Sequence, residues 1–167
     1  AADFNSIINS KGTAAQKALL GKSSTDWQKE IYRNAISIDN NVSITGSIKN
    51  IPVRASVGYL NQNGILKTSN MDRISTSMGV SPSFFNNSLK VDLNLKSSVI
   101  NNNFANQGAI GTAVGFDPTQ SVTGSDFGGY FEWLDPATKK PNSLGPKNPL
   151  GLLNLQKDQS KVNRTIA

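Results

Sequence analysis

The side chains best suited to chemistry in this chain gather in its glycine-rich second half. Tyr130 and Trp133 stand beside three acidic residues, Asp126, Glu132 and Asp135. Aromatic rings can stack on a sugar ring, and carboxylates accept hydrogen bonds from its hydroxyls. The group is therefore a candidate carbohydrate-binding site. The simpler interpretation is that the aromatic side chains form the small core of a folded loop.

Catalysis has few possible participants here. The chain contains no cysteine and no histidine, which excludes thiol nucleophiles, disulfides, imidazole bases and the common zinc sites. Glu132 with Asp126 or Asp135 is the only local carboxylate pair for a glycosidase mechanism. Acidic residues near turns usually serve the turn itself. We therefore expect no enzymatic activity, no cofactor and no metal site.

Composition narrows the class of protein further. The chain has 167 residues, of which 37% are hydrophobic, and a net charge of +6 from lysines and arginines that are scattered along it. This pattern indicates a thin core and a basic surface, and it does not predict nucleic-acid binding. No segment has the roughly 20 consecutive apolar residues of a membrane-spanning helix. The first residues do not resemble a signal peptide, so an exported protein would not begin here.

Apolar and polar residues alternate through four successive segments between Ile36 and Val99. A period of two places the apolar side chains on one face of a β-strand, whereas a helix would need a period of 3.6. The polar positions hold mostly small, uncharged residues. The apolar positions of the four segments are Ile36, Ile38, Val42, Ile44 and Ile48; Val53, Ala55, Val57 and Tyr59; Ile74, Thr76, Met78 and Val80; and Leu89, Val91, Leu93, Leu95 and Val99.

The connections between these segments alternate in length. Residues 49–52 and 85–88 form short turns, whereas 61–72 form a longer connection that contains the turn signal Asn63-Gly64. Outer-membrane barrels have long two-faced strands, short periplasmic turns and longer outer loops. We therefore predict a mainly β fold, with antiparallel up-and-down strands that form part of a large transmembrane β-barrel. The alternative is an antiparallel sheet with one face on a soluble core.

The remaining segments are less regular. Residues 1–26 include a short helical pattern that ends at Gly21, and we interpret them as a linker into the first strand. From 101 to 161 the periodicity is lost and Gly, Pro, Asn and Ser accumulate, which predicts a long irregular loop. Within it, Asn148-Pro149 predicts the start of a short helix.

Three runs of residues carry a resemblance to a known family. They are TDWQKEIYRNA at 25–35, IPVRASVGYLNQNGILKTSNMDR at 51–73 and SPSFFNNSLKVDLNLK at 81–96, and their order and spacing resemble the SusC/RagA family of TonB-dependent outer-membrane transporters. Two further runs, NNNFANQGAIGTAVGFDPTQSV at 101–122 and NPLGLLNLQKDQSKVNR at 148–164, resemble the long extracellular segment that follows in that family. The resemblance covers nearly the whole chain from Asp26 onward.

The resemblance implies a barrel of about 22 strands with an N-terminal plug. Such a protein imports oligosaccharides or peptides with energy from the TonB complex and is capped by a SusD-like surface lipoprotein. We expect an internal fragment located in the Gram-negative outer membrane. The implied parts are the end of the plug region in 1–26, four antiparallel strands in two hairpins in 27–100, a long extracellular loop in 101–161 and the start of a further strand in 162–167.

The implied partners are the SusD-like lipoprotein, outer-membrane lipid, a glycan or peptide substrate, and the TonB complex through a plug region that this chain lacks. Charges on the polar faces of the strands would project into the barrel lumen, where we expect them to pair with neighbouring or plug charges. Trp27, Tyr32 and Tyr59 lie near predicted strand ends, as in an aromatic girdle. For Trp27, packing between plug and barrel is an equal alternative. The lumen-facing charges are Arg54, Arg73, Lys90, Asp92 and Lys96.

A soluble β-rich carbohydrate-binding or adhesion module, with Trp133 as its sugar platform, is the rival interpretation. The two differ in what the apolar faces touch. In a sandwich these residues pack against a second sheet, whereas in a transporter segment they form one continuous outward band. The diagnostic residues are Ile38, Ile44, Val57, Met78, Val91 and Leu93.

Overall fold

The computed structural model describes residues 1–125 and 127–167, and these residues fall into two compact units. The helical unit contains Ala1–Arg33, Leu66–Thr68 and Ala105–Asp158. The strand unit contains Asn34–Ile65, Ser69–Phe104 and Gln159–Ala167. Each unit is assembled from segments that lie far apart in the sequence, so both depend on long-range contacts.

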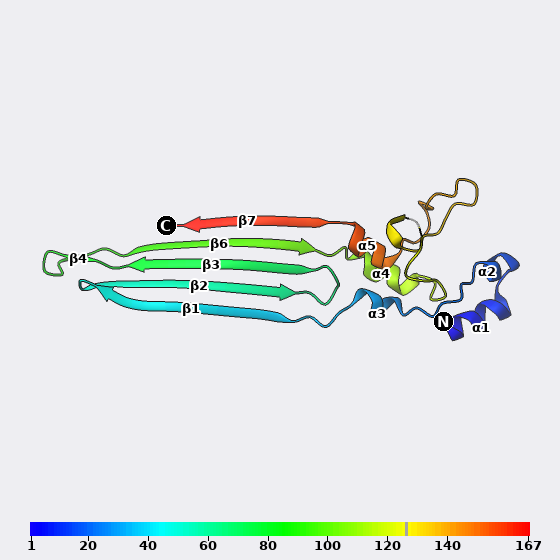
Figure 1. Cartoon of the computed structure of the whole chain (residues 1–167), viewed down its shortest axis with the longest axis horizontal. Coiled ribbons are helices and arrows are strands. Elements are labelled where there is room, and N and C mark those ends of the chain that lie inside the picture. The colour runs from blue at the N-terminus through cyan, green and yellow to red at the C-terminus, as the bar shows by residue number, and fades with distance from the viewer. Residues whose placement is uncertain (126) are drawn as a thin grey trace. The chain divides into compact units, whose positions relative to one another are not determined.

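The strand unit is a five-stranded sheet with the order β1-β2-β3-β6-β7, accompanied by the two-stranded sheet β4-β5 (Figure 1). Neighbouring strands of the large sheet run in opposite directions, which confirms the mainly β, antiparallel fold. Among the described residues the sheet is open and does not close on itself. The strands are β1 (Ser37–Ile48), β2 (Ile51–Asn63), β3 (Asn70–Val80), β4 (Ser83–Phe84), β5 (Leu89–Lys90), β6 (Leu93–Phe104) and β7 (Asp158–Ile166).

A two-residue turn joins β1 to β2. Lys49 and Asn50 both have left-handed backbone conformations, with φ of 49° and 66°. Positive φ at both central residues is the pattern of a type I′ turn, whose twist matches that of the flanking strands. This turn therefore fixes the pairing of Ile48 with Ile51 and with it the register of the whole hairpin.

The register places the alternating residues on two distinct faces. Ile44, Ala55, Met78 and Leu95 pair directly across β1, β2, β3 and β6 and so form one row. Because partners in an antiparallel pair share a face, this row and its neighbours define an apolar face. The next row, Ser43, Ser56, Ser77 and Lys96, defines the polar face. The apolar face includes Ile38, Val42, Ile44, Val57, Tyr59, Ile74, Met78, Leu93 and Leu95, all of which are exposed.

The fourth predicted strand is corrected by the structure. The alternation suggested one strand from Leu89 to Val99, but Leu89–Lys90 is β5, which pairs with β4 in a local hairpin, and β6 begins only at Leu93. Lys90 and Asp92 thus lie outside the five-stranded sheet, as does Val91. Local pairing wins here because residues 85–87 all take left-handed conformations, which reverses the chain within a few residues.

The helical unit contains more helix than the sequence indicated. Its elements are α1 (Ala2–Lys11), α2 (Ala14–Ala18), α3 (Trp27–Ile31), α4 (Gly108–Gly115), the 3-10 turn η1 (Phe127–Gly129) and α5 (Pro149–Leu155). The helix predicted at Asn148-Pro149 is confirmed as α5, and the short helical pattern before Gly21 is confirmed as α2. No helix in the described part of the chain is long and apolar enough to span a membrane.

Three expected boundaries differ from the structure. Trp27–Ile31, which lies in the region 27–100 assigned to the strands, is helical because Asp26 accepts a hydrogen bond from the Lys29 N–H and the Trp27 and Ile31 side chains are buried on one helix face. Gly108–Gly115, expected to be loop, is α4 and buries Ala109 and Ala113. The last strand begins at Asp158 rather than 162. The larger division into plug end, barrel strands and extracellular loop stays a prediction.

The core of the described residues lies in the helical unit. Three helices contribute to it: α3 with Trp27 and Ile31, α4 with Ala109 and Ala113, and α5 with Leu153. Leu66 and Phe116, which lie outside these helices, complete it. Truncating a fully buried leucine costs about 2–5 kcal/mol because a cavity remains. The same substitution at an exposed leucine has almost no cost.

We predict that Leu153→Ala lowers the free energy of unfolding of the helical unit by about 2–5 kcal/mol, because Leu153 is only 1% exposed. Leu144→Ala is the matched control, since Leu144 is 95% exposed. Urea unfolding followed by tryptophan fluorescence measures both, because Trp27 and Trp133 belong to this unit. Equal stability of the two variants would show that the core is not assembled as described.

Candidate functional site

A tight turn at Phe116–Gln120, the FDPTQ sequence, is the most densely hydrogen-bonded feature of the helical unit. The Asp117 carboxylate accepts hydrogen bonds from the Thr119 N–H at 2.8 Å, the Thr119 hydroxyl at 2.7 Å and the Gln120 amide at 3.1 Å. Thr119 is completely buried and Gln120 is 7% exposed. Asp117 therefore fixes the orientation of two buried polar side chains, and we call residues 116–120 the junction turn.

The chain that leads into α3, residues 19–27, lies along the junction turn, and we call it the entry segment. Every second residue of the entry segment is bonded to the turn. The Gln120 side-chain amide donates to the Leu19 carbonyl at 2.8 Å, and the Gly21 N–H donates to the Thr119 hydroxyl at 2.8 Å. The Ser23 and Thr25 N–H groups donate to the carbonyls of Thr119 and Pro118 at 2.9 and 2.8 Å.

Two further bonds extend this pairing at its carboxyl end. The Thr25 hydroxyl donates to the Gln120 carbonyl at 2.6 Å, and the Trp27 indole N–H donates to the Asp117 carbonyl at 2.9 Å. The Trp27 ring also meets the Phe116 ring edge-on, with centroids 4.7 Å apart. The approach at the other end is so close that a Cβ at Gly21 would lie 2.1 Å from the Thr119 carbonyl oxygen. Glycine is therefore required at this position.

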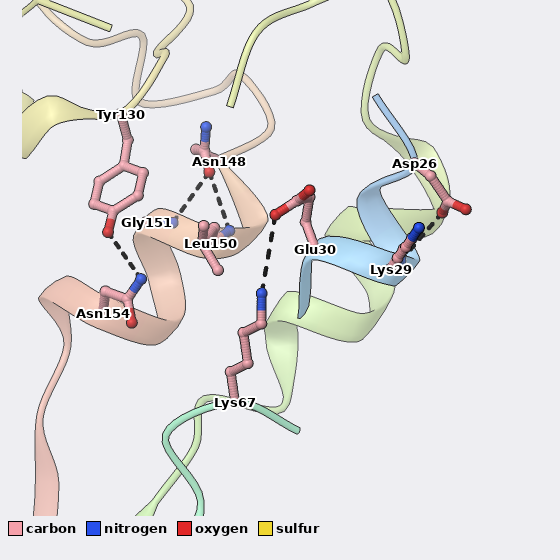
Figure 2. A network of polar contacts seen from close by, with 9 residues as sticks. All are labelled: Asp26, Lys29, Glu30, Lys67, Tyr130, Asn148, Leu150, Gly151 and Asn154. Atoms are coloured by element: carbon pink, nitrogen blue, oxygen red, sulfur yellow. Dashed lines mark hydrogen bonds and ion pairs between the residues drawn. The ribbon is translucent and has the colours of Figure 1, made fainter. Parts of the chain in front are cut away.

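Asn148 organises the opposite side of the helical unit. Its side-chain oxygen accepts hydrogen bonds from the N–H groups of Leu150 and Gly151, which caps α5 (Figure 2). Its side-chain amide donates to the carbonyls of Val122 and Phe131 at 3.0 and 3.1 Å. A fully buried asparagine thus satisfies all of its hydrogen-bonding groups. It ties α5 to the loop that carries the candidate carbohydrate-binding residues.

The candidate carbohydrate-binding residues have separate environments and do not form one site among the described residues. The Trp133 ring packs against Phe131 at 5.2 Å between centroids and against Phe116 at 6.4 Å, so it contributes to the core of the unit. The Tyr130 hydroxyl accepts a hydrogen bond from the Asn154 side chain at 2.8 Å (Figure 2). Glu132 lines a shallow depression with Lys147. Asp126 lies outside the described residues.

Asp135 has a local role in its own turn. Its carboxylate accepts hydrogen bonds from the Ala137 and Thr138 N–H groups at 2.9 and 2.8 Å and from the Thr138 hydroxyl at 3.2 Å. The bonds from Thr138, backbone first and then side chain, lower the pKa of Asp135 below its ordinary value, because they stabilise the charged form. The carboxylate of Asp135 therefore stabilises its own turn.

The predicted lumen-facing charges divide into two groups. The register places Arg54, Arg73 and Lys96 on the polar face, whereas Lys90 lies in β5 and Asp92 between β5 and β6. On the polar face a groove of about 290 Å³ is lined by Ser56, Ser75, Ser77, Ser98, Lys96 and Arg164. The Ser56 and Ser77 hydroxyls are 2.7 Å apart across β2 and β3.

Neither unit offers the residues of a metal centre. In residues 1–125 and 127–167 no group of three acidic side chains is close enough to hold an ion. An ion pair joins the Lys67 and Glu30 side chains at 3.9 Å, and both are more than a third exposed (Figure 2). An exposed pair of this kind contributes about 0–1 kcal/mol and so belongs to the fold rather than to chemistry.

In the sequence, FDPTQ is the part of the run at 101–122 that now forms the junction turn, and it was given no role of its own. A partial signal was present, because an aspartate two positions before a threonine is typical of a side-chain-capped turn. What no local pattern could reveal is the bonding of this turn to residues some 90 positions earlier, as in the Trp27–Asp117 bond. The close approach of Gly21 to Thr119 and the bonds from the Asn148 amide to Val122 and Phe131 are hidden in the sequence for the same reason.

Long antiparallel strands with one exposed apolar face and one hydroxyl-rich face are typical of outer-membrane barrel proteins. The chain is 41% identical over 160 residues to the TonB-dependent receptor SusC of Bacteroides thetaiotaomicron, an alignment that covers 86% of this chain. The chain is therefore homologous to a segment of a TonB-dependent receptor, and its resemblance to the SusC/RagA family is confirmed. No family model matches the chain.

The chain spans 16% of the length of this curated relative. Receptors of this kind are outer-membrane proteins, which confirms the predicted location. The substrate and the partners of such a receptor depend on the whole protein, of which these two units are a small part.

We predict that the pKa of Asp135 lies below the ordinary value of about 3.9 for an aspartate. A depressed pKa means that the stabilising contribution is present above the pKa of the unfolded chain and is lost as the pH falls through the folded pKa. NMR titration of the Asp135 carboxyl carbon measures it directly. Thr138→Val, which removes one donor, should raise the pKa, while Thr138→Ser should leave it low. An unshifted pKa in all three proteins would contradict the described turn.

Proposed function

We propose that this chain is part of the barrel wall and of the adjoining folded segment of an outer-membrane, TonB-energised importer. In this proposal the apolar face of the sheet contacts lipid and the polar face lines the lumen. The observation that supports it most is the exposure of the apolar face: Ile44 is 72% exposed, Met78 55% and Leu95 47%, although they form one continuous row. A soluble sheet would cover such a row with a second layer.

The height of the apolar face supports a membrane setting. Along β2 the apolar positions run from Ile51 to Tyr59, which at about 3.3 Å per residue is roughly 26 Å of strand. With the tilt of strands in outer-membrane barrels this corresponds to about 20 Å across the bilayer, close to the apolar band of about 25 Å that such barrels present. Tyr59 ends the band, in the position that an interfacial aromatic residue takes.

Beyond Tyr59 the same face becomes polar on β2 and β3. Asp72 accepts hydrogen bonds from the Asn61 side chain at 2.5 Å and from the Tyr59 hydroxyl at 3.4 Å. Asn63 donates to Asn61 at 3.0 Å and accepts from Asn70 at 3.2 Å. A network of amides suits contact with water and lipid headgroups, since unpaired polar groups are costly in the hydrocarbon region.

The finer features of the proposal follow from the homology. We propose import of oligosaccharides or peptides together with a SusD-like surface lipoprotein, as the resemblance implies. Tyr130, Glu132 and Trp133 are the residues of the helical unit proposed to approach substrate or lipoprotein. Arg54, Arg73 and Lys96 are proposed to face the lumen and to pair with charges of the plug.

A charge placed on each face of β3 tests this proposal. In the full-length receptor, Met78→Lys should cost about 2–4 kcal/mol in the bilayer midplane and reduce the amount of assembled barrel. Ser75→Lys, on the polar face of the same strand, should assemble normally, because its partners in the register are Gly58 and Ser98 and neither carries a charge. Heat-modifiable electrophoretic mobility of outer-membrane fractions measures assembly. Normal assembly of both variants, or a monomeric, detergent-free protein, would favour a soluble carbohydrate-binding module instead.

A labelling experiment tests the predicted extracellular position of 101–161. Because the structure packs residues 105–158 of this segment and residues 1–33 into one unit, a single probe reports on both. Leu144→Cys introduces a reactive thiol at a position that is 95% exposed in a chain without cysteine. Labelling of intact cells by a membrane-impermeant maleimide is the expected result. Labelling only after the outer membrane is permeabilised would place both segments on the periplasmic side.

A further inference from the structure

The entry segment is held in an unusual way. Each of its alternate residues is bonded to the same short turn; they are Leu19, Gly21, Ser23, Thr25 and Trp27. The chain before this segment is attached differently. The helices α1 and α2 bury none of their residues. In the helical unit, the chain before Leu19 is therefore loosely attached, and the chain after it is firmly bonded to the junction turn.

We propose that the junction turn is a mechanical stop: it holds the entry segment in place when the chain on its amino-terminal side is pulled. This inference rests on the proposed function, in which a TonB-energised receptor experiences tension in the region before the first strand. Under tension α1 and α2 come away at low force, and extension stops where the bonded residues begin.

The arrangement of the bonds explains why the stop is strong. Backbone and side-chain bonds attach alternate residues of the entry segment to one turn, so tension along the segment loads several of them together. The turn itself is rigid because Asp117 holds Thr119 and Gln120 by their side chains. Trp27 adds a ring contact with Phe116 at 4.7 Å and a side chain that is only 3% exposed.

The stop also determines which strand bears the load. The entry segment continues through α3 into β1. The junction turn lies instead in the connection between β6 and β7. Tension is therefore passed to that connection, and β1 is spared.

Single-molecule pulling on the full-length receptor tests the inference. The receptor is held in a bilayer, and force is applied to the chain on the amino-terminal side of residue 1. The wild-type protein should show a resistance peak when the chain up to residue 20 is released. Gly21→Ala, whose Cβ meets the Thr119 carbonyl, should abolish this peak. The extension should then continue by the length of residues 21–36, roughly 55 Å.

Matched variants separate the stop from a general loss of structure. Gly111→Ala introduces the same methyl group where nothing lies within 4 Å, so its peak should be unchanged. Thr119→Val removes the hydroxyl that accepts from Gly21 and donates to Asp117, and should lower the peak, whereas Thr119→Ser should keep it. TonB-dependent uptake should follow the peak across the series.

Two results would overturn the inference. One is a wild-type trace without resistance at this point, which needs no variant. The other is an unchanged peak in both Gly21→Ala and Thr119→Val. Failure of the proposed function would be visible before any pulling, since the wild-type receptor would not assemble as a heat-modifiable outer-membrane protein or would not depend on TonB for uptake.

Discussion

The antiparallel register between neighbouring strands is the constraint on which the strand unit depends. Because side chains alternate with a period of two, a shift of one residue would transfer every apolar side chain to the opposite face. The two left-handed residues at the β1–β2 turn fix the first hairpin, and pairing of Ala55 with Met78 and of Met78 with Leu95 carries the register onward. Both faces, and every role proposed for them, follow from these pairings.

The strands were largely predictable because their signal is local. Alternation from residue to residue identifies β1, β2 and β3. The polar residues between the apolar ones show no helical periodicity that would contradict it. The fourth segment was misjudged because alternation continues from Leu89 to Val99 while the backbone does not. A reversal at 85–87 pairs Leu89 with Phe84 and leaves β6 to begin at Leu93. Periodicity reports which side chains share a face, but not where a chain changes partner.

The helical unit was much less predictable. Its glycine-rich helix α4 has a low intrinsic propensity, and it forms because Ala109 and Ala113 pack into a shared core with Trp27 and Leu153. The candidate acidic and aromatic residues were found by type, but their arrangement depends on contacts beyond any local window. Asp135 serves its own turn, and the Trp133 ring packs against Phe131 and Phe116. The buried hydrogen bonds of Asn148 and Gly21 involve partners that proximity in sequence does not reveal.

The composition of the helical unit from distant segments has a kinetic consequence. Trp27 emerges early in synthesis and export, but Asp117, which receives its indole hydrogen bond, follows 90 residues later, and Leu153 later still. Contacts of such sequence separation require a large loop to close before any stabilisation is gained, which slows folding. During that interval Trp27, Ile31 and the apolar strands are exposed together in water. A chain built in this way is exposed to aggregation for longer than a protein whose core is made of neighbouring segments.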